Sequence, residues 1–203
     1  IEYEACGVTK DNRGERVDEA IQLMRKLWEQ DNVTHSGTFY NCQNTSITPK
    51  PFLKPSTPVW IGGRSKAAAR RVGRVGDGWL VSSATPNEIS IGRNILFETA
   101  DQHKREIEED HVGILLGFYV DKDKSVATSK SEPYITRNRP DLHFSEVSAL
   151  GTTEDICETI QKYIEAGAYK LVVRPLCAEA ESMEQLSIIG EEVLPNFHNA
   201  ITV

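Results

Sequence analysis

A short cluster of glycine, hydroxyl and basic residues lies in the first third of the chain, in the order Gly62-Gly63-Arg64-Ser65. Backbone N–H groups at the start of a helix have no partner inside that helix, and glycine lets a ligand oxygen approach them closely. Ser65 adds a hydroxyl and Arg64 adds a guanidinium, both of which are donors suited to phosphate. These four residues are therefore candidates for a phosphate-binding turn.

The charges around this turn agree with anion binding. Five basic residues and no carboxylate occur between positions 64 and 74, in a chain whose formal net charge is −7. They are Arg64, Lys66, Arg70, Arg71 and Arg74. A local positive field attracts phosphate. The same pattern is equally typical of a glycine turn followed by a solvated basic helix face, because Gly-Gly alone is a weak motif.

The residues on both sides of the turn predict a strand before it and a helix after it. The apolar run at 58–62 is typical of a strand. After the turn, small and apolar residues recur on one side of a predicted helix, which favours a helix that lies close against a sheet. They are Ala68, Ala69, Val72 and Val75. Gly76-Asp77-Gly78 ends that helix, and a second strand is predicted at 78–83.

The rest of the chain continues this alternation. Further strands are predicted at 112–120 and 169–174, and a hairpin or extended excursion at 33–47. Helices are predicted over 12–30, from the capping box Thr85-Pro86-Asn87-Glu88 to about Glu109, over 153–166, and from a second capping-box pattern at Ser182 onward. The charged end of the second of these helices, 103–110, indicates a solvated end rather than a site. The segment 121–148 has no clear period.

Two architectures are compatible with four strands that alternate with helices in a single domain covering 1–203. One is an open doubly wound sheet, and the other is half of an eight-stranded (β/α) barrel. No G-x-G-x-x-G follows any strand, which disfavours the open nucleotide-binding sheet. Barrel enzymes carry their sites at the C-terminal ends of the strands and frequently bind phosphate there, where 62–65 would lie.

The pattern P-x-W-I-G-G-x-S, the Ala/Arg-rich helix and G-D-G-W-L together resemble the signature of the bacterial luciferase-like monooxygenases. These are oxidoreductases that depend on a flavin or a deazaflavin. The segments Glu4–Val8 and Arg13–Ala20 upstream, and 151–155 and 171–175 downstream, are similar to the same family. The resemblance covers most of the chain and is weakest over 122–147.

The resemblance implies a (β/α)8 TIM barrel, of which only the C-terminal half, with about four strands, would be present. It further implies reduced FMN or the deazaflavin coenzyme F-420 as cofactor, with its phosphate held by Gly62, Gly63, Arg64 and Ser65. The reaction would be that of a monooxygenase or of a hydride-transferring dehydrogenase or reductase on a small-molecule substrate. A homodimer is expected for the full-length parent.

Two other readings remain open: a non-catalytic barrel remnant or subunit, and a barrel enzyme that binds a phosphorylated metabolite without flavin. No catalytic acid or base is assigned. His35, His111 and His143 are candidates only because histidine is a residue type suited to acid–base chemistry, and solvated or structural roles are favoured for each. Asp121, Asp123 and Ser125 imitate the start of a calcium loop, but the required glycine and distal glutamate are missing, so no metal site is predicted.

Composition limits the partners and the compartment. The negative net charge argues against a nucleic-acid partner, and no stretch approaches the length of a membrane helix. The four cysteines are widely spaced, which indicates neither zinc nor a disulfide framework. We expect a cytoplasmic protein. The opening IEYEACGV begins with Ile1 and reads like the middle of an element, so we expect the N-terminal strands of the barrel to be missing and the chain to be the C-terminal portion of a longer protein.

Overall fold

The computed structural model describes residues 2–53, 56–135 and 139–197. Its strands are β1 (Val33–Ser36), β2 (Asn41–Thr45), β3 (Trp60–Gly62), β4 (Gly78–Ser82), β5 (Val112–Val120), β6 (Ser148–Gly151) and β7 (Lys170–Pro175). Its α-helices are α1 (Glu2–Ala5), α2 (Arg13–Glu29), α3 (Lys66–Val75), α4 (Pro86–Gln102), α5 (Lys124–Ser131), α6 (Thr153–Glu165) and α7 (Glu179–Ile188). Short 3-10 turns cover Glu132–Tyr134, Phe144–Val147 and Leu194–Asn196, and a π-helix covers Ile189–Val193. None of the described helices is both long enough and apolar enough to cross a membrane.

The larger sheet is parallel throughout, so the C-terminal ends of its strands meet along one edge. Residues 113–115 of β5 pair with both β4 and β7, which places these two strands on opposite sides of β5. Residues 117–118 pair with both β6 and β7, so β6 continues the β4 side of β5 beyond the end of β4. The order across the sheet is therefore β3, β4, β5, β7.

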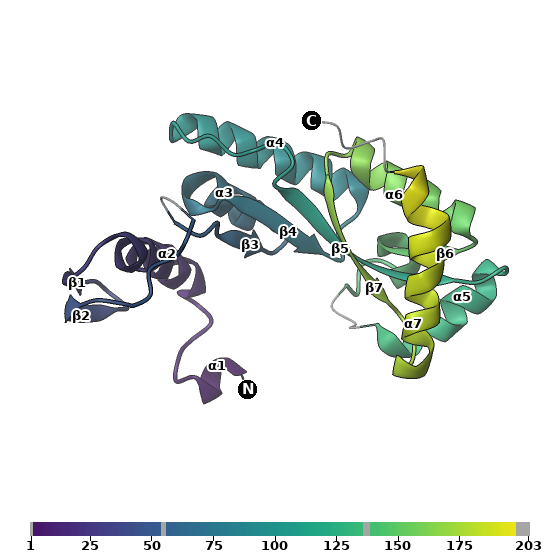
Figure 1. The fold of residues 1–203 in the computed structure, drawn as a ribbon, viewed down its shortest axis with the longest axis horizontal. Helices are drawn as coiled ribbons and strands as arrows, with labels where there is room; N and C mark the ends of the chain where they lie inside the picture. Colours follow the sequence, from purple (N-terminus) through teal and green to yellow (C-terminus); the bar gives the residue numbers. More distant parts are fainter. Residues whose placement is uncertain (1, 54–55, 136–138, 198–203) are drawn as a thin grey trace.

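One face of this sheet is covered by α3, α4 and α6, and the core lies between (Figure 1). Ile114, Leu116 and Phe118 of β5 point into it and are at most 1% exposed. Each such side chain contributes roughly 1.5–3 kcal/mol when fully buried. Trp79 of β4 lies in the same core, and the absence of a side chain at Gly92 of α4 makes room for its ring.

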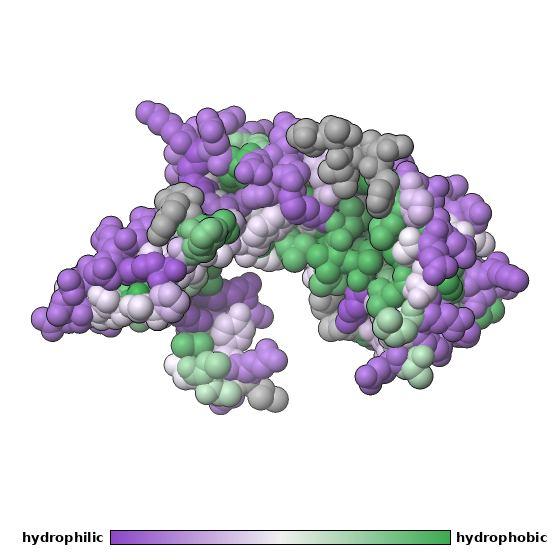
Figure 2. Space-filling model, viewed as in Figure 1, coloured by the Kyte–Doolittle hydropathy of each residue, from purple (hydrophilic) through white to green (hydrophobic). Residues whose placement is uncertain are grey.

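The opposite face of the sheet is hollowed and carries apolar surface (Figure 2). Because side chains alternate along a strand, Leu80 of β4 and Leu115 of β5 point to this face, together with Val172 of β7. Leu80 and Leu115 are half-buried, and Val172 is 47% exposed.

An aspartate attaches the N-terminal part of the chain to the sheet. Asp77, at the N-terminal end of β4, accepts hydrogen bonds from Arg25 of α2 at 2.7 and 2.8 Å and from Arg105 at 3.0 Å. The N–H of Val59 donates to the same carboxylate at 2.8 Å. Consequently α2 and the antiparallel β1–β2 hairpin lie at the β3 end of the molecule, away from α6 and α7 (Figure 1).

The four strands predicted near 58–62, 78–83, 112–120 and 169–174 are confirmed as β3, β4, β5 and β7, and the hairpin is confirmed as well. Two elements in the segment without a clear period were missed. In α5 the pattern that imitates a calcium loop is a helix cap, since Asp123 accepts from the N–H of Ser125 at 2.8 Å. β6 has only four residues, too few to show a period.

The predicted boundaries of two helices were wrong. α4 ends at Gln102 and not near Glu109, because the backbone turns at Lys104, where φ is +53°. This turn carries Arg105 back to the carbonyl oxygens of Val72 and Gly73, at 3.1 Å each, so the charged end is not wholly solvated.

The last helix, α7, begins at Glu179 and not at Ser182. Ser182 lies inside the helix and donates to the carbonyl of Ala178. Gln185, which was read as the second member of a capping box, is buried and bonds to both the N–H and the carbonyl of Val120 at the end of β5.

Candidate functional site

The turn from Gly62 to Ser65 lies at the C-terminal end of β3 and is exposed throughout. Gly63 has φ +100°, a conformation that side chains disfavour, and a Cβ there would lie 3.3 Å from the Cβ of Ala68. The buried indole of Trp79 donates from Nε1 to the carbonyl of Gly63 at 2.8 Å. The turn is therefore fixed by the strand next to it.

Ser65 is the N-cap of α3. Its Oγ accepts from the N–H of Ala68 at 3.1 Å, which leaves its O–H free to donate to a ligand. Within the described part of the chain, the N–H groups of Lys66 and Ala67 have no backbone or side-chain acceptor. The start of α3 thus offers several donors directed at solvent.

The five basic residues between positions 64 and 74 do not all contribute to one positive field at the turn. Asp18 of α2 accepts from Arg71 Nε at 2.6 Å and from Arg74 Nη2 at 2.7 Å. These two cations therefore connect α2 to α3 and share the single negative charge of Asp18. Arg64, Lys66 and Arg70 are exposed, and the described ion pairs include none of them.

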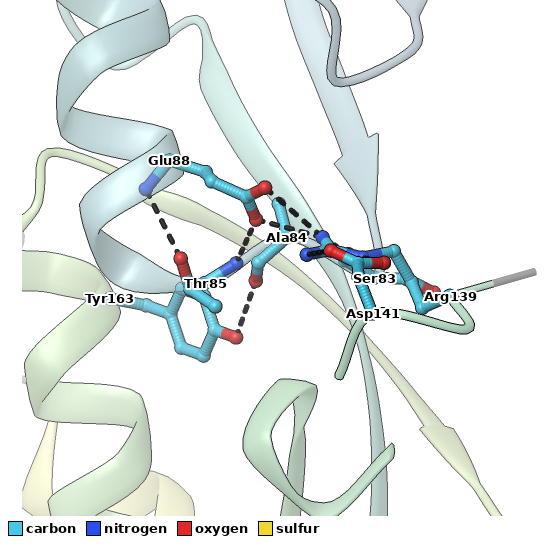
Figure 3. Close-up of polar contacts among 7 residues, drawn as sticks. All are labelled: Ser83, Ala84, Thr85, Glu88, Arg139, Asp141 and Tyr163. Carbon is cyan, nitrogen blue, oxygen red and sulfur yellow. Dashed lines mark hydrogen bonds and ion pairs between the residues drawn. The ribbon is translucent and has the colours of Figure 1, made fainter. Parts of the chain in front are cut away.

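The loop after β4 is held by two groups that are distant in the sequence and by one from the following helix (Figure 3). Arg139 Nη1 donates to the carbonyl of Ser83 at 2.9 Å, and the hydroxyl of Tyr163 donates to the carbonyl of Ala84 at 2.7 Å. Glu88 accepts from the N–H of Thr85 at 2.8 Å and completes the predicted capping box. Ser83 is held at φ +52°, which is uncommon for a residue with a side chain.

Arg139 connects the carboxylates of this network. Its side chain is 7% exposed, and it bonds to Glu88 at 2.9 Å and to Asp141 at 2.8 Å. Partial burial acts to raise the pKa of Glu88, but hydrogen bonds from Arg139 and Thr85 outweigh it, so the pKa lies below the ordinary value. Arg139 also lowers the pKa of Asp141, with a smaller contribution from the charge of Arg64. Arg64 is thus electrostatically coupled to this loop region.

A cavity of about 610 Å³ opens at the same edge of the sheet. Its apolar wall includes Leu115, Phe144 and Leu176. Its polar lining includes Ser82 and Ser83 after β4, His143, and two arginines, Arg139 and Arg174. The volume falls within the ~300–1,000 Å³ typical of ligand pockets.

The three histidines occupy different places. His35 Nε2 lies 3.1 Å from Glu19, whose carboxylate accepts from the backbone of the β1–β2 turn, so His35 supports the hairpin. His111 Nδ1 lies 2.7 Å from the carbonyl of Asp77, at the N-terminal edge of the sheet. His143 is exposed and lines the cavity, with Nδ1 2.7 Å from Ser145 Oγ.

Glu108, Asp110 and His111 bring potential metal-ligand atoms within 4.8 Å of one another. This group lies at the N-terminal edge of the sheet, away from the turn. Asp110 is already bonded to Lys170, and His111 Nε2 lies 3.4 Å from Glu108. Internal ion pairs account for the arrangement.

The sequence interpretation did not single out Arg139, Ser83 or Arg174. Ser83 and Arg174 lie at the C-terminal ends of predicted strands. Functional side chains of parallel sheets often lie there, so the sequence could have identified both as candidates. Arg139 lies in a segment without periodicity. It is paired with a glutamate 51 positions away, and no local sequence pattern indicates such a pair.

Comparison with known proteins gives a family. Residues 1–192 match the model of a family described as luciferase-like monooxygenase. An uncharacterised protein of Mycobacterium bovis is 36% identical over 121 residues, which are 59% of this chain and 41% of that protein. An FMNH2-dependent dimethylsulfone monooxygenase of Pseudomonas fluorescens is 37% identical over 84 residues, 40% of this chain and 22% of that enzyme.

A solved F420-dependent secondary alcohol dehydrogenase superposes with a TM-score of 0.76 at 20% identity, covering 92% of this chain and 62% of that one. At this identity the likeness shows the fold, an α/β arrangement with a parallel sheet. The chain spans less than two thirds of the length of each of these three proteins.

Proposed function

The chain belongs to the luciferase-like monooxygenase family, as its sequence motifs predicted, and on this premise we propose that it acts in a flavin- or deazaflavin-dependent oxidoreductase. Its part is to hold the phosphate of FMN or coenzyme F-420 at Gly62, Gly63, Arg64 and Ser65. Relatives in the family carry both cofactors in their names, so the choice between the two is left to experiment.

The observation that carries this proposal is the geometry of the turn. The N–H groups at the start of α3 are unpartnered within the described chain and exposed, and Gly63 adopts a conformation that turns the backbone without a side chain in the way. Ser65 has a hydroxyl proton to donate, and Arg64 has a guanidinium with no ion pair among the described residues. These donors suit the three acceptor oxygens of a phosphate monoester.

Bound cofactor supplies the redox chemistry of the family, which is oxygen activation by reduced flavin or hydride transfer with a deazaflavin. The residues of this chain bind and orient it. The phosphate is fixed at the end of β3, and the Trp79 indole keeps the Gly63 carbonyl turned away from it. The cavity beside β4, β5 and β7 provides an apolar space at the same edge for a second small molecule.

The arc β3, β4, β5, β7 is further proposed to be half of a (β/α)8 barrel. Parallel strands that follow chain order from β3 to β7, with α3, α4 and α6 on one face and an opposite face that is partly apolar and exposed at Val172, support this. In a closed barrel the inner face is a packed core. Leu80, Leu115 and Val172 would belong to that core.

The test compares FMN with riboflavin, which has the same ring system and no phosphate. Titration of the full-length parent protein by flavin fluorescence quenching should show FMN binding roughly ten- to a hundredfold more tightly, the value of one hydrogen bond to a charged group. Gly63→Val should remove this difference and leave riboflavin affinity unchanged. Equal affinities in the unmodified chain would place the phosphate elsewhere. Competition by glucose 6-phosphate as strong as that by FMN would instead favour a barrel that binds a phosphorylated metabolite.

A further inference from the structure

The cavity at the C-terminal edge carries a charge pattern that the cofactor turn does not explain. Of the two arginines in its lining, Arg139 is fully engaged by Glu88, Asp141 and the Ser83 carbonyl. Arg174, the fifth residue of β7, is exposed, and among the described residues its hydrogen bonding is limited to a long contact, 3.5 Å from Nη2 to the carbonyl of Tyr134. The ion pairs of the described residues include none for Arg174.

One wall of the cavity beside Arg174 is apolar, while the lining also contains a carboxylate, Glu132. Leu176, two positions further along, is buried and lies over Gly117, whose missing side chain leaves the space that its methyl groups occupy. Leu115 and Phe144 line the same cavity. A guanidinium beside an apolar wall suits a molecule with an acid group at one end and an apolar body, since the planar fork of arginine matches a carboxylate or sulfonate.

The distance between the cofactor turn after β3 and Arg174 in β7 is large enough to separate phosphate binding from acid binding. β3 and β7 are three strand spacings apart, about 14 Å along the sheet at roughly 4.8 Å per spacing. An acid held at Arg174 therefore extends over β5 toward the turn without competing for the phosphate donors. Its apolar body would lie where the cofactor ring approaches.

We propose that Arg174 is the specificity-determining residue of the substrate site and that the substrate is a small organic acid with an apolar body, bound by its acid group. This rests on the proposed function, because only a cofactor at the turn makes the cavity a substrate site. The acid preference itself is a property of the cavity alone.

The experiment uses 4-phenylbutyrate as the probe and 4-phenylbutanamide as its neutral counterpart, both titrated into the full-length parent protein by calorimetry or ligand-observed NMR. The acid should bind at least about fivefold more tightly than the amide, allowing for the exposure of the guanidinium. Arg174→Gln should remove this preference without changing the amide affinity. Arg174→Lys should keep part of it. Arg70→Gln, which removes an exposed cation of α3, is the matched control and should leave the preference intact. The melting temperature of each variant checks that it folds.

The outcomes separate the two proposals. Loss of the preference for FMN over riboflavin in Gly63→Val, together with retained acid preference, supports both. Equal binding of acid and amide in the unmodified chain overturns the inference, and so does an acid preference that survives in Arg174→Gln. If Arg174→Gln weakens FMN and riboflavin equally, the guanidinium serves the cofactor ring, and the inference is again wrong. Absence of a phosphate effect with an intact acid preference overturns the proposed cofactor turn alone.

Discussion

At the residue scale, the two glycines of the turn have different reasons to be glycine. Gly63 has φ +100° and a neighbouring methyl group at 3.3 Å, so the fold itself disfavours a side chain there. Gly62 lies in strand geometry, and a Cβ would meet only the carbonyl of Leu80 at 3.6 Å, an ordinary contact. The fold does not require glycine at 62, whereas a closely approaching ligand would.

This difference separates folding from binding. Gly63→Ala should destabilise the chain by roughly 1–3 kcal/mol, the cost of a residue in a sparsely populated backbone region. Gly62→Ala should leave the free energy of unfolding nearly unchanged and still weaken FMN relative to riboflavin. Urea denaturation and flavin titration measure the two effects. Unchanged FMN affinity in a folded Gly62→Ala variant would show that the phosphate does not approach this residue.

Arg64 is exposed, so its contribution should depend on salt. Arg64→Ala should weaken FMN binding more at low ionic strength than at high, because exposed charges are screened over about 10 Å at 0.1 M salt. Titrations at several salt concentrations measure this. Arg70→Ala, which removes another exposed cation from α3, is the control and should have the smaller effect. A salt-independent penalty at Arg64 would contradict an electrostatic role.

At the scale of elements, the loop between β4 and α4 depends on groups distant in the sequence. Arg139 and Tyr163 fix the Ser83 and Ala84 carbonyls, and burial raises the pKa of the Tyr163 hydroxyl, which keeps it a donor. Glu88 connects the helix cap to Arg139. The left-handed backbone at Ser83 is therefore held from three sides.

The lowered pKa of Glu88 predicts a pH-dependent contribution to stability. A carboxyl whose pKa is lower in the folded state stabilises the fold above its unfolded pKa of about 4.3, and this contribution is lost as the pH falls through the folded value. Glu88→Gln should cost about 1–2 kcal/mol at pH 7, allowing for its partial exposure, and less at pH 3. Urea denaturation at both pH values tests this. Glu98→Gln, an exposed residue of the same helix, is the control. An equal cost of Glu88→Gln at both pH values would show that its charge is not what stabilises the loop.

At the scale of the whole molecule, one face of the parallel sheet is hollowed and partly apolar (Figure 2). The sheet ends at β3 and β6 on one side of β5 and at β7 on the other side, and the other described strands, β1 and β2, form a separate hairpin. Unpaired strand edges and exposed apolar faces promote association.

The chain alone should therefore dimerise, aggregate or remain partly unfolded. Val172→Glu places a charge on the hollowed face and should reduce association in sedimentation velocity. Met183→Glu, at a residue of α7 that is 71% exposed, is the matched control and should have little effect. A monodisperse monomer that melts cooperatively in the unmodified chain would contradict the prediction.

The sequence alone determined the features that depend on neighbouring residues. Apolar runs between turn residues identified four strands, because β-favouring apolar residues bounded by turn residues are a local signature of a strand. Ser65 and the Thr85–Glu88 box were identified as caps because capping is completed within four residues. The family signature around 58–80 could also be identified from the sequence, because its residues are neighbours in the chain.

Tertiary structure decided whatever depends on residues far apart in the sequence. It paired Arg71 and Arg74 with Asp18 of α2, so a basic run that predicted a phosphate field is partly an attachment between helices. It brought Arg139 to Glu88 across 51 positions and placed Arg174 beside an apolar wall. β6 and α5 formed because β5 and its neighbours offered them partners, and short elements gain most of their stability from such packing. A run of charged residues in a sequence indicates a possible site, but only the fold determines which of those residues are already engaged in ion pairs.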